Sequence, residues 1–258
     1  MKKISYYLFL SLSVAFSLLF LSFTPDKESL KKDTRLYELR TYYAEPGKLE
    51  DLVARFRNHS TKILAKHGMK NEGYWLPIDN KDNKLVYLLS YPSREARDKS
   101  WKDFSADPAW QKVATESEKN GKLITRVEEV FLKTTDFSPS KVKKKGEKNR
   151  VFELRTYKAT PNNLDNLLAR FRGFTVNAFA KYGMTNLWYW TTTAENNDML
   201  IYFLSHPSQE AGLAAFDKFR QDAAWTEVRK ASEVKGGGSL TVSVVSEYMT
   251  ATDFSPMK

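Results

Sequence analysis

The chain has 258 residues, of which 41 are basic and 31 acidic, giving a formal net charge of +10, and it contains no cysteine. This length is sufficient for two modest hydrophobic cores, and the absence of cysteine excludes disulfides, thiolate metal sites and a cysteine nucleophile. The positive charge does not indicate a nucleic-acid partner, because part of it lies in one lysine run and no nucleic-acid-binding motif is recognisable.

The first 24 residues have the pattern of a secretory leader. Lys2 and Lys3 precede an uncharged, mainly apolar run over residues 4–23. A positive start followed by such a run is typical of a signal peptide, and about twenty apolar residues are also enough to span a bilayer. We expect residues 1–24 to be a signal peptide, cleaved between Ser22 and Pro25, or an N-terminal anchor. The protein is then extracytoplasmic (periplasmic, secreted or membrane-anchored), and it meets a membrane only through this segment.

The next hundred residues show a regular order of elements. Residues 36–42 alternate in the manner of a strand. A helix with an apolar stripe follows and ends near Gly68, and residues 69–76 and 85–91 are predicted to be two further strands. Ser93 is the expected N-cap of the next helix, Asp107 begins a second short helix, and residues 123–132 form the last strand.

The same pattern recurs from residue 151. Leu36-Tyr-Glu-Leu-Arg-Thr-Tyr42 returns as Val151-Phe-Glu-Leu-Arg-Thr-Tyr157, and Thr-Asp-Phe-Ser-Pro closes both copies. A repeat of this length is domain-sized. We predict a first domain over residues 34–139, a basic linker over 140–149 and a second domain over 150–256.

The order strand, helix, strand, strand, helix, strand is that of a ferredoxin-like domain, in which helices cover one face of an antiparallel sheet. The uncovered faces of two such sheets can pack together and close a barrel. We therefore predict an α+β fold in which two tandem ferredoxin-like domains form an intramolecular dimeric α+β barrel.

These motifs resemble those of the NIPSNAP family. The residues that carry the resemblance are Tyr37-Glu-Leu-Arg-Thr-Tyr42, Gly68-Met69, Gly73-Tyr74-Trp75 and Phe137-Ser138-Pro139, and in the second copy Phe152-Glu-Leu-Arg-Thr-Tyr157, Gly183-Met184, Trp188-Tyr189-Trp190 and Phe254-Ser255-Pro256. The resemblance implies the dimeric α+β barrel superfamily, whose members include small monooxygenases, haem-processing enzymes and proteins of unsettled activity. It implies no set of catalytic residues, so whether the chain is an enzyme stays open.

Polar residues alternate with apolar ones on the first strand of each copy. If Tyr37 and Leu39 face the helices, alternation directs the polar row into the barrel, where a charge needs a partner. We predict a pocket for a small, possibly anionic ligand, bound by the arginines and walled by aromatic side chains. Its predicted residues are Glu38, Arg40, Tyr42, Glu153, Arg155, Tyr157, Trp75 and Trp190. The alternative is that these residues form structural ion pairs and aromatic core.

Two other functions remain open at this stage. An interaction or scaffold protein would have a filled barrel and outward-facing contacts, including those of a homo-oligomer. A haem-binding or cofactor-independent monooxygenase-like enzyme would place His67 or His206 as a single axial ligand. None of the three histidines has a second histidine or carboxylate at the spacing of a zinc helix, so we predict no metal site and no cofactor.

Overall fold

The computed structural model describes residues 33–142, 150–194 and 198–258, which belong to one compact unit, Lys32–Lys258. The expected leader and most of the expected basic linker lie outside the described residues. Within the described ranges, no helix is both long and apolar enough to cross a membrane. We call residues 33–142 the first half and residues 150–258 the second half.

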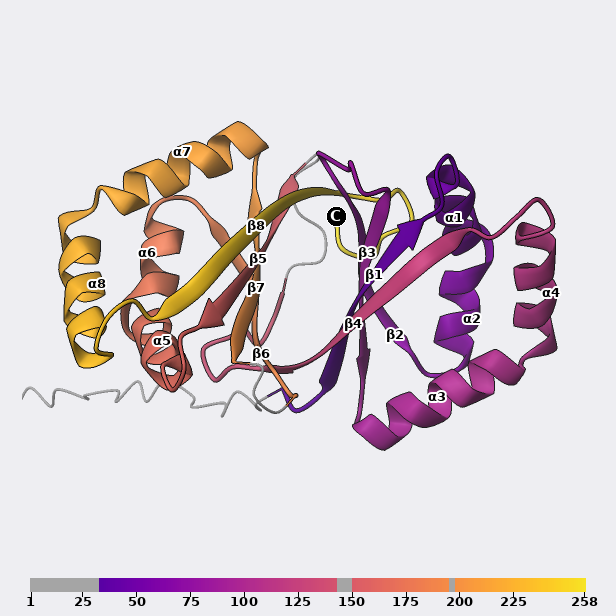
Figure 1. The fold of residues 1–258 in the computed structure, drawn as a ribbon, viewed down its shortest axis with the longest axis horizontal. Helices are drawn as coiled ribbons and strands as arrows, with labels where there is room; N and C mark the ends of the chain where they lie inside the picture. Colours follow the sequence, from indigo (N-terminus) through magenta and orange to yellow (C-terminus); the bar gives the residue numbers. More distant parts are fainter. Residues whose placement is uncertain (1–32, 143–149, 195–197) are drawn as a thin grey trace, which may run out of the picture. The chain divides into compact units, whose positions relative to one another are not determined.

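The two halves have the same order of elements (Figure 1). The first half contains β1 (Leu36–Ala44), α1 (Leu49–Arg55), the π-helix η1 (Phe56–Ser60), α2 (Thr61–Lys66), β2 (Lys70–Pro77), β3 (Lys84–Tyr91), α3 (Arg94–Ala106), α4 (Pro108–Ser117) and β4 (Ile124–Thr134). The second contains β5 (Val151–Ala159), α5 (Leu164–Arg170), the π-helix η2 (Phe171–Thr175), α6 (Val176–Lys181), β6 (Thr185–Thr192), β7 (Met199–His206), α7 (Gln209–Arg220), α8 (Ala223–Lys235) and β8 (Thr241–Ala251).

The strands close an antiparallel barrel in the order β1-β3-β2-β8-β5-β7-β6-β4. Strands of the two halves meet at two seams, where β2 pairs with β8 and β4 pairs with β6. The helices of each half lie on the outer side of its own strands (Figure 1). The predicted intramolecular α+β barrel is therefore confirmed.

The closing segment of each half lies on the other half. The backbone N–H of Tyr74 donates to Ser255 Oγ at 2.9 Å, and that of Tyr189 donates to Ser138 Oγ at 3.0 Å. The adjacent rings Phe254 and Phe137 pack on the same tyrosines. The repeated Asp-Phe-Ser sequence thus fastens the halves reciprocally.

The barrel interior is apolar and aromatic. Tyr37 and Leu39 of β1 belong to this core, with Trp75, Trp190 and residues from both halves. The prediction that Tyr37 and Leu39 face the helices is wrong, and the polar row beside them faces the helices instead. The interior is enclosed by strands on every side, whereas the helix side offers arginine partners for a buried carboxylate, so the charged row is less costly there.

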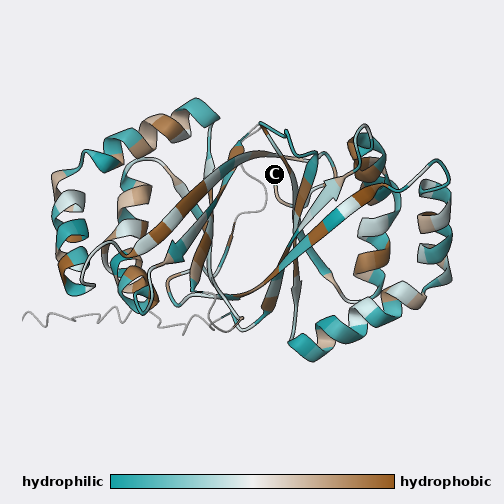
Figure 2. Ribbon diagram, viewed as in Figure 1, coloured by the Kyte–Doolittle hydropathy of each residue, from teal (hydrophilic) through white to brown (hydrophobic). Residues whose placement is uncertain are grey.

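Two further cores lie between the strands and the helices, one in each half. The outer helix α3 is mostly hydrophilic, whereas α7 has both hydrophilic and hydrophobic segments (Figure 2). Each half therefore has barrel interior, sheet and helices in sequence.

Local signals behave as the sequence indicates, with one exception. Ser93 and Asp107 cap α3 and α4 through their side chains, and Gly68 and Gly183 have a φ of +80° at the helix ends. The first predicted helix of each half is interrupted by a π turn. Ser60 Oγ donates to the Arg55 carbonyl, five residues earlier, at 3.3 Å, which favours this wider turn.

Substitution of Gly73 tests the packing of the barrel interior. A Cβ atom at Gly73 would lie 2.2 Å from Cη2 of Trp75, whereas one at Gly173 would meet no atom within 4 Å. We expect Gly73→Ala to lower the free energy of unfolding by about 1–3 kcal/mol, because the indole has little room to move. Gly173→Ala should leave it unchanged or raise it by up to about 1 kcal/mol. Urea denaturation measures both, and equal stability of Gly73→Ala and the parent chain would contradict this packing.

Candidate functional site

The polar row of β1 forms a dense ion-pair network under α3. Glu38 is fully buried, and its Oε1 accepts from Arg40 Nη1 at 2.5 Å and from Arg97 Nη2 at 2.7 Å. Its Oε2 accepts from the Tyr91 hydroxyl at 2.7 Å and from Trp101 Nε1 at 3.1 Å. Both oxygens of this carboxylate are therefore fully engaged with donors from β1, β3 and α3.

These donors decide the protonation state of Glu38. Burial alone would raise the pKa of the carboxyl, but the hydrogen bond from Arg97, the charge of Arg40 and the Tyr91 hydroxyl outweigh it and lower the pKa to about 2. Glu38 is thus an ionised structural acceptor and is not a general base for chemistry near neutral pH.

The second half has the same polar row on β5, but its buried glutamate has different hydrogen-bond partners. Glu153, also fully buried, accepts from Arg155 Nη1 at 2.5 Å and from Ser246 Oγ at 2.6 Å, and its Oε2 lies 2.8 Å from His206 Nε2. Burial opposes ionisation, yet the hydrogen bond to His206 and the charge of Arg155 lower the pKa of Glu153. Gly212 leaves room for this arrangement, because a Cβ there would lie 3.0 Å from the His206 ring.

The predicted site residues therefore do not meet in one place. Glu38, Arg40 and Tyr42 lie under the helices of the first half, and Glu153, Arg155 and Tyr157 under those of the second. Trp75 and Trp190 lie in the barrel interior. The prediction of a single interior pocket lined by both rows is wrong, because the rows face away from the interior.

A cavity of about 170 Å³ lies between the sheet and the helices of the first half. Tyr42 is the one predicted residue that lines it. Its other lining residues are Arg55, Phe56, Ser60, Leu64, Tyr87, Trp101, Phe104, Trp110, Ala114, Glu118 and Ile124. The Tyr87 hydroxyl is buried beside Tyr42, as that of its counterpart Tyr202 is beside Tyr157. The cavity combines aromatic walls with the polar side chains of Arg55, Ser60 and Glu118.

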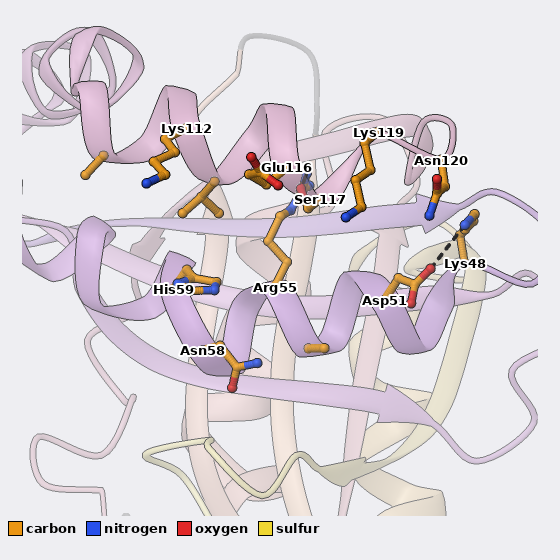
Figure 3. Close-up of a pocket in the computed structure, with 13 residues that line it drawn as sticks. Lys48, Asp51, Arg55, Asn58, His59, Lys112, Glu116, Ser117, Lys119 and Asn120 are labelled. Carbon is orange, nitrogen blue, oxygen red and sulfur yellow. Dashed lines mark hydrogen bonds and ion pairs between the residues drawn. The ribbon is translucent and has the colours of Figure 1, made fainter.

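A larger groove of about 720 Å³ runs between α1, η1 and α4 (Figure 3). It is lined by Lys48, Asp51, Ala54, Arg55, Asn58, His59, Ala109, Lys112, Val113, Glu116, Ser117, Lys119 and Asn120. Arg55 is the residue that lines both the groove and the cavity. The groove is thus the solvent-facing neighbour of the aromatic cavity.

Arg55 bridges α1 and α4. Its side chain extends from α1 toward Ser117 (Figure 3), and its Nη1 donates to Glu118 Oε1 at 2.9 Å and to Ser117 Oγ at 3.3 Å. The guanidinium carbon lies 5.3 Å from the centre of the Trp110 ring. The side chain is 4% exposed, and its buried Nε has no partner among the described residues.

Arg55, Trp101, Tyr87 and Trp110 are not among the site residues predicted from the sequence. The sequence does contain a signal for Arg55. Arg55 and Arg170 occupy equivalent positions on the otherwise apolar stripe of the first helix of each copy. An arginine at such a position must be buried or must reach a partner. Which of these occurs depends on α4, which is distant in sequence.

The histidines considered as haem ligands are held by carboxylates. His67 Nε2 lies 2.7 Å from Asp107 Oδ2, and the buried His206 lies against Glu153. Among the described residues, no cluster of three histidine, cysteine, aspartate or glutamate side chains could hold a metal ion. The described geometry thus gives the haem alternative no open axial position at His206.

The family model for NIPSNAP matches residues 37–139 and 152–256. The chain belongs to the NIPSNAP family. A solved NIPSNAP family protein of unknown function from Agrobacterium tumefaciens is 23% identical over 42% of this chain and 95% of that chain, with a TM-score of 0.38. No curated protein matches this NIPSNAP chain.

Two solved structures resemble both halves of this NIPSNAP protein together. An anthrone oxidase-like protein is 14% identical over 85% of this chain and 92% of that chain, with a TM-score of 0.56. A "putative monooxygenase" from Lactobacillus acidophilus is 14% identical over 85% of this chain and 94% of that chain, with a TM-score of 0.53. At this identity the likeness establishes the shared barrel fold.

The network around Glu38 predicts a specific pH dependence. A folded pKa of about 2 against an ordinary value of 4.5 stabilises the protein above pH 4.5, and this contribution is lost as the pH falls through 2. We expect Glu38→Gln to lower the free energy of unfolding at pH 7 by about 3 kcal/mol, because two arginines lose their acceptor. The difference from the parent chain should shrink between pH 4.5 and 2.

Urea denaturation across this pH range measures the effect. Glu129→Gln is the matched control, because Glu129 binds the same arginines but its side chain is 42% exposed. The Glu129→Gln control should lower the free energy of unfolding by less than about 1 kcal/mol. A Glu38→Gln difference that does not change with pH would contradict the low pKa.

Proposed function

We propose that this NIPSNAP protein is an exported small-molecule-binding protein whose ligand occupies the aromatic cavity of the first half. The observation that carries the proposal is that cavity, walled by rings and bordered by the Arg55 side chain. Ligand sites are typically apolar hollows with a few convergent polar groups. The adjoining groove provides space for parts of a ligand that extend beyond the cavity.

In this proposal the polar row of β1 acts in two ways. Tyr42 contacts the ligand, because it lines the cavity. Glu38 and Arg40 position the wall, since Glu38 accepts from the Trp101 indole and the Arg40 guanidinium lies 4.4 Å from the centre of that ring. Trp101 is thereby held by a hydrogen bond and a cation–π contact in a fixed orientation at the cavity.

The predicted residues of the second half have a packing role in this proposal. The Arg155 guanidinium lies 4.2 Å from the centre of the Phe216 ring, and Tyr157 packs on Phe171 and Tyr202. Trp75 and Trp190 fill the barrel interior. These side chains support the fold on which the first-half site depends.

We assign no reaction to the bound ligand. The names monooxygenase and anthrone oxidase-like belong to proteins that are 14% identical to this chain. Glu38 is saturated with donors and is not available as a base. Glu118, which lines the cavity, is paired with Arg55. Export is proposed from the charge and apolar run of residues 1–24.

The proposal predicts that a larger side chain in the cavity expels the ligand. Ala114 of α4 lines the cavity, and Thr115 beside it is exposed. Native mass spectrometry of the protein from its own host should detect a bound small molecule. Ala114→Phe should lose it, and Thr115→Phe should retain it. Absence of any bound molecule in the parent chain, or equal retention in both variants, would overturn the proposal.

A second candidate function is self-association through the second half. Apolar side chains are exposed there on α7, α8 and β8: Leu213, Val234, Val242, Val244 and Val245. Their counterparts in the first half are mostly polar: Asp98, Lys119, Thr125, Val127 and Glu128. Exposed apolar patches commonly mark protein contacts. A dimer in the same native mass spectra would support this function, and a monomer would exclude it.

A further inference from the structure

We infer that the ligand is a monocyclic aromatic carboxylate, with its ring in the first-half cavity and its carboxylate on Arg55. This inference rests on the proposed function and specifies the ligand class of the same site. It also restricts the site to one half of a duplicated fold. Three features of the first half support it: the unused donor of Arg55, the charge of the groove and the size of the cavity beside them.

Arg55 is a buried cation with unused donors. Only Nη1 of its guanidinium donates to described residues, namely to Glu118 and Ser117. Nη2 has no hydrogen-bond partner among the described residues, so it can donate to a carboxylate oxygen. Nε is fully buried and is not reached by a ligand in this arrangement.

The groove around Arg55 favours anions. Lys48, Lys112 and Lys119 line it, against Asp51 and Glu116. Lys48 is paired with Asp51 at 3.2 Å, whereas Lys112 and Lys119 form no ion pair among the described residues. With Arg55 and its partner Glu118 included, the groove and the cavity have four basic and three acidic side chains, an excess of one positive charge. Such a groove attracts an anion and guides it toward the buried guanidinium.

The cavity selects the size and shape of the apolar part. A dry cavity of about 150 Å³ can hold benzene, and the cavity here is about 170 Å³. Phe56, Tyr87 and Trp110 supply aromatic faces and edges around it. Flat rings stack favourably on such walls. One six-membered ring therefore fits, and larger substituents would extend into the groove.

The second half lacks this arrangement, although it has the same fold. The positions of Lys48, Lys112 and Lys119 are occupied by Asn163, Glu227 and Val234. The three lysines are therefore not needed to form an α+β half of this type. Their presence in one copy indicates a property that is particular to the first half.

The helices of the second half are also bridged across the equivalent groove. Phe174, in the place of His59, stacks on Trp225 with ring centres 6.4 Å apart. Asn163 Nδ2 donates to the Gly236 carbonyl at 3.0 Å, which joins the start of α5 to the end of α8. Arg170, the counterpart of Arg55, donates through Nη1 to Ser232 Oγ at 3.4 Å and also has a buried Nε, so the halves differ in the groove and its charge and not in this arginine. The second half accordingly provides an internal control.

Calorimetric titration of the full chain with benzoate and with benzamide tests the inference. Benzamide has nearly the same shape but no charge. Benzoate should bind the parent chain more tightly than benzamide. Arg55→Gln should weaken benzoate binding by about tenfold or more and leave benzamide binding unchanged, because a charge-assisted hydrogen bond is lost. Arg170→Gln should leave benzoate binding unchanged.

A second variant protects the test if Arg55→Gln does not fold. Lys112→Glu with Lys119→Glu changes only exposed groove residues, and it should weaken benzoate binding without changing the melting temperature. Equal affinity for benzoate and benzamide, with no effect of either variant, would overturn the anionic ligand but leave the cavity proposal intact. Loss of benzoate binding in Arg170→Gln would overturn the assignment to the first half. No binding of benzoate would overturn the ligand class. The proposed function is tested separately by native mass spectrometry.

Discussion

The structure depends on the closure of one barrel by two halves of the same chain. The seams between β2 and β8 and between β4 and β6 close the barrel, and the reciprocal Asp-Phe-Ser segments fasten the halves. An enclosed space lined by eight strands must be filled, and aromatic residues such as Trp75 and Trp190 fill it. The Glu-Arg pair of the first strand of each half is consequently directed to the helix side.

This exclusion of charge explains the network around Glu38. Burial of a carboxylate costs several kcal/mol, and four donors from three elements offset that cost. The network fixes α3 and the Trp101 indole relative to β1, so electrostatic pairing and the shape of the cavity are linked. The same row in the second half uses His206 and Ser246 instead, which shows that the fold requires a satisfied carboxylate but not particular partners.

Comparison of the two halves distinguishes the features that the fold requires from those that belong to the proposed site. The barrel core, the helix caps and the interlocking ends are present in both halves. The basic groove is a property of the first half, and the exposed valines of β8 are a property of the second. One copy can diverge in this way because the groove and the exposed valines lie outside the shared barrel core. The proposed ligand site and the exposed apolar surface then lie on different halves.

The sequence by itself determined the elements, their order, the duplication and the barrel, because these follow from local alternation, caps such as Ser93 and Asp107, and the repeated motifs. It also identified Glu38 and Arg40 as buried and paired. Only the tertiary structure decided which way these side chains face. Alternation distinguishes the two faces of a strand but does not say which one faces the barrel interior. Both faces of the first strand are buried, one by the other strands and one by the helices. The cavity at Arg55 likewise could not be predicted from the sequence, because it forms only where α4 packs across α1.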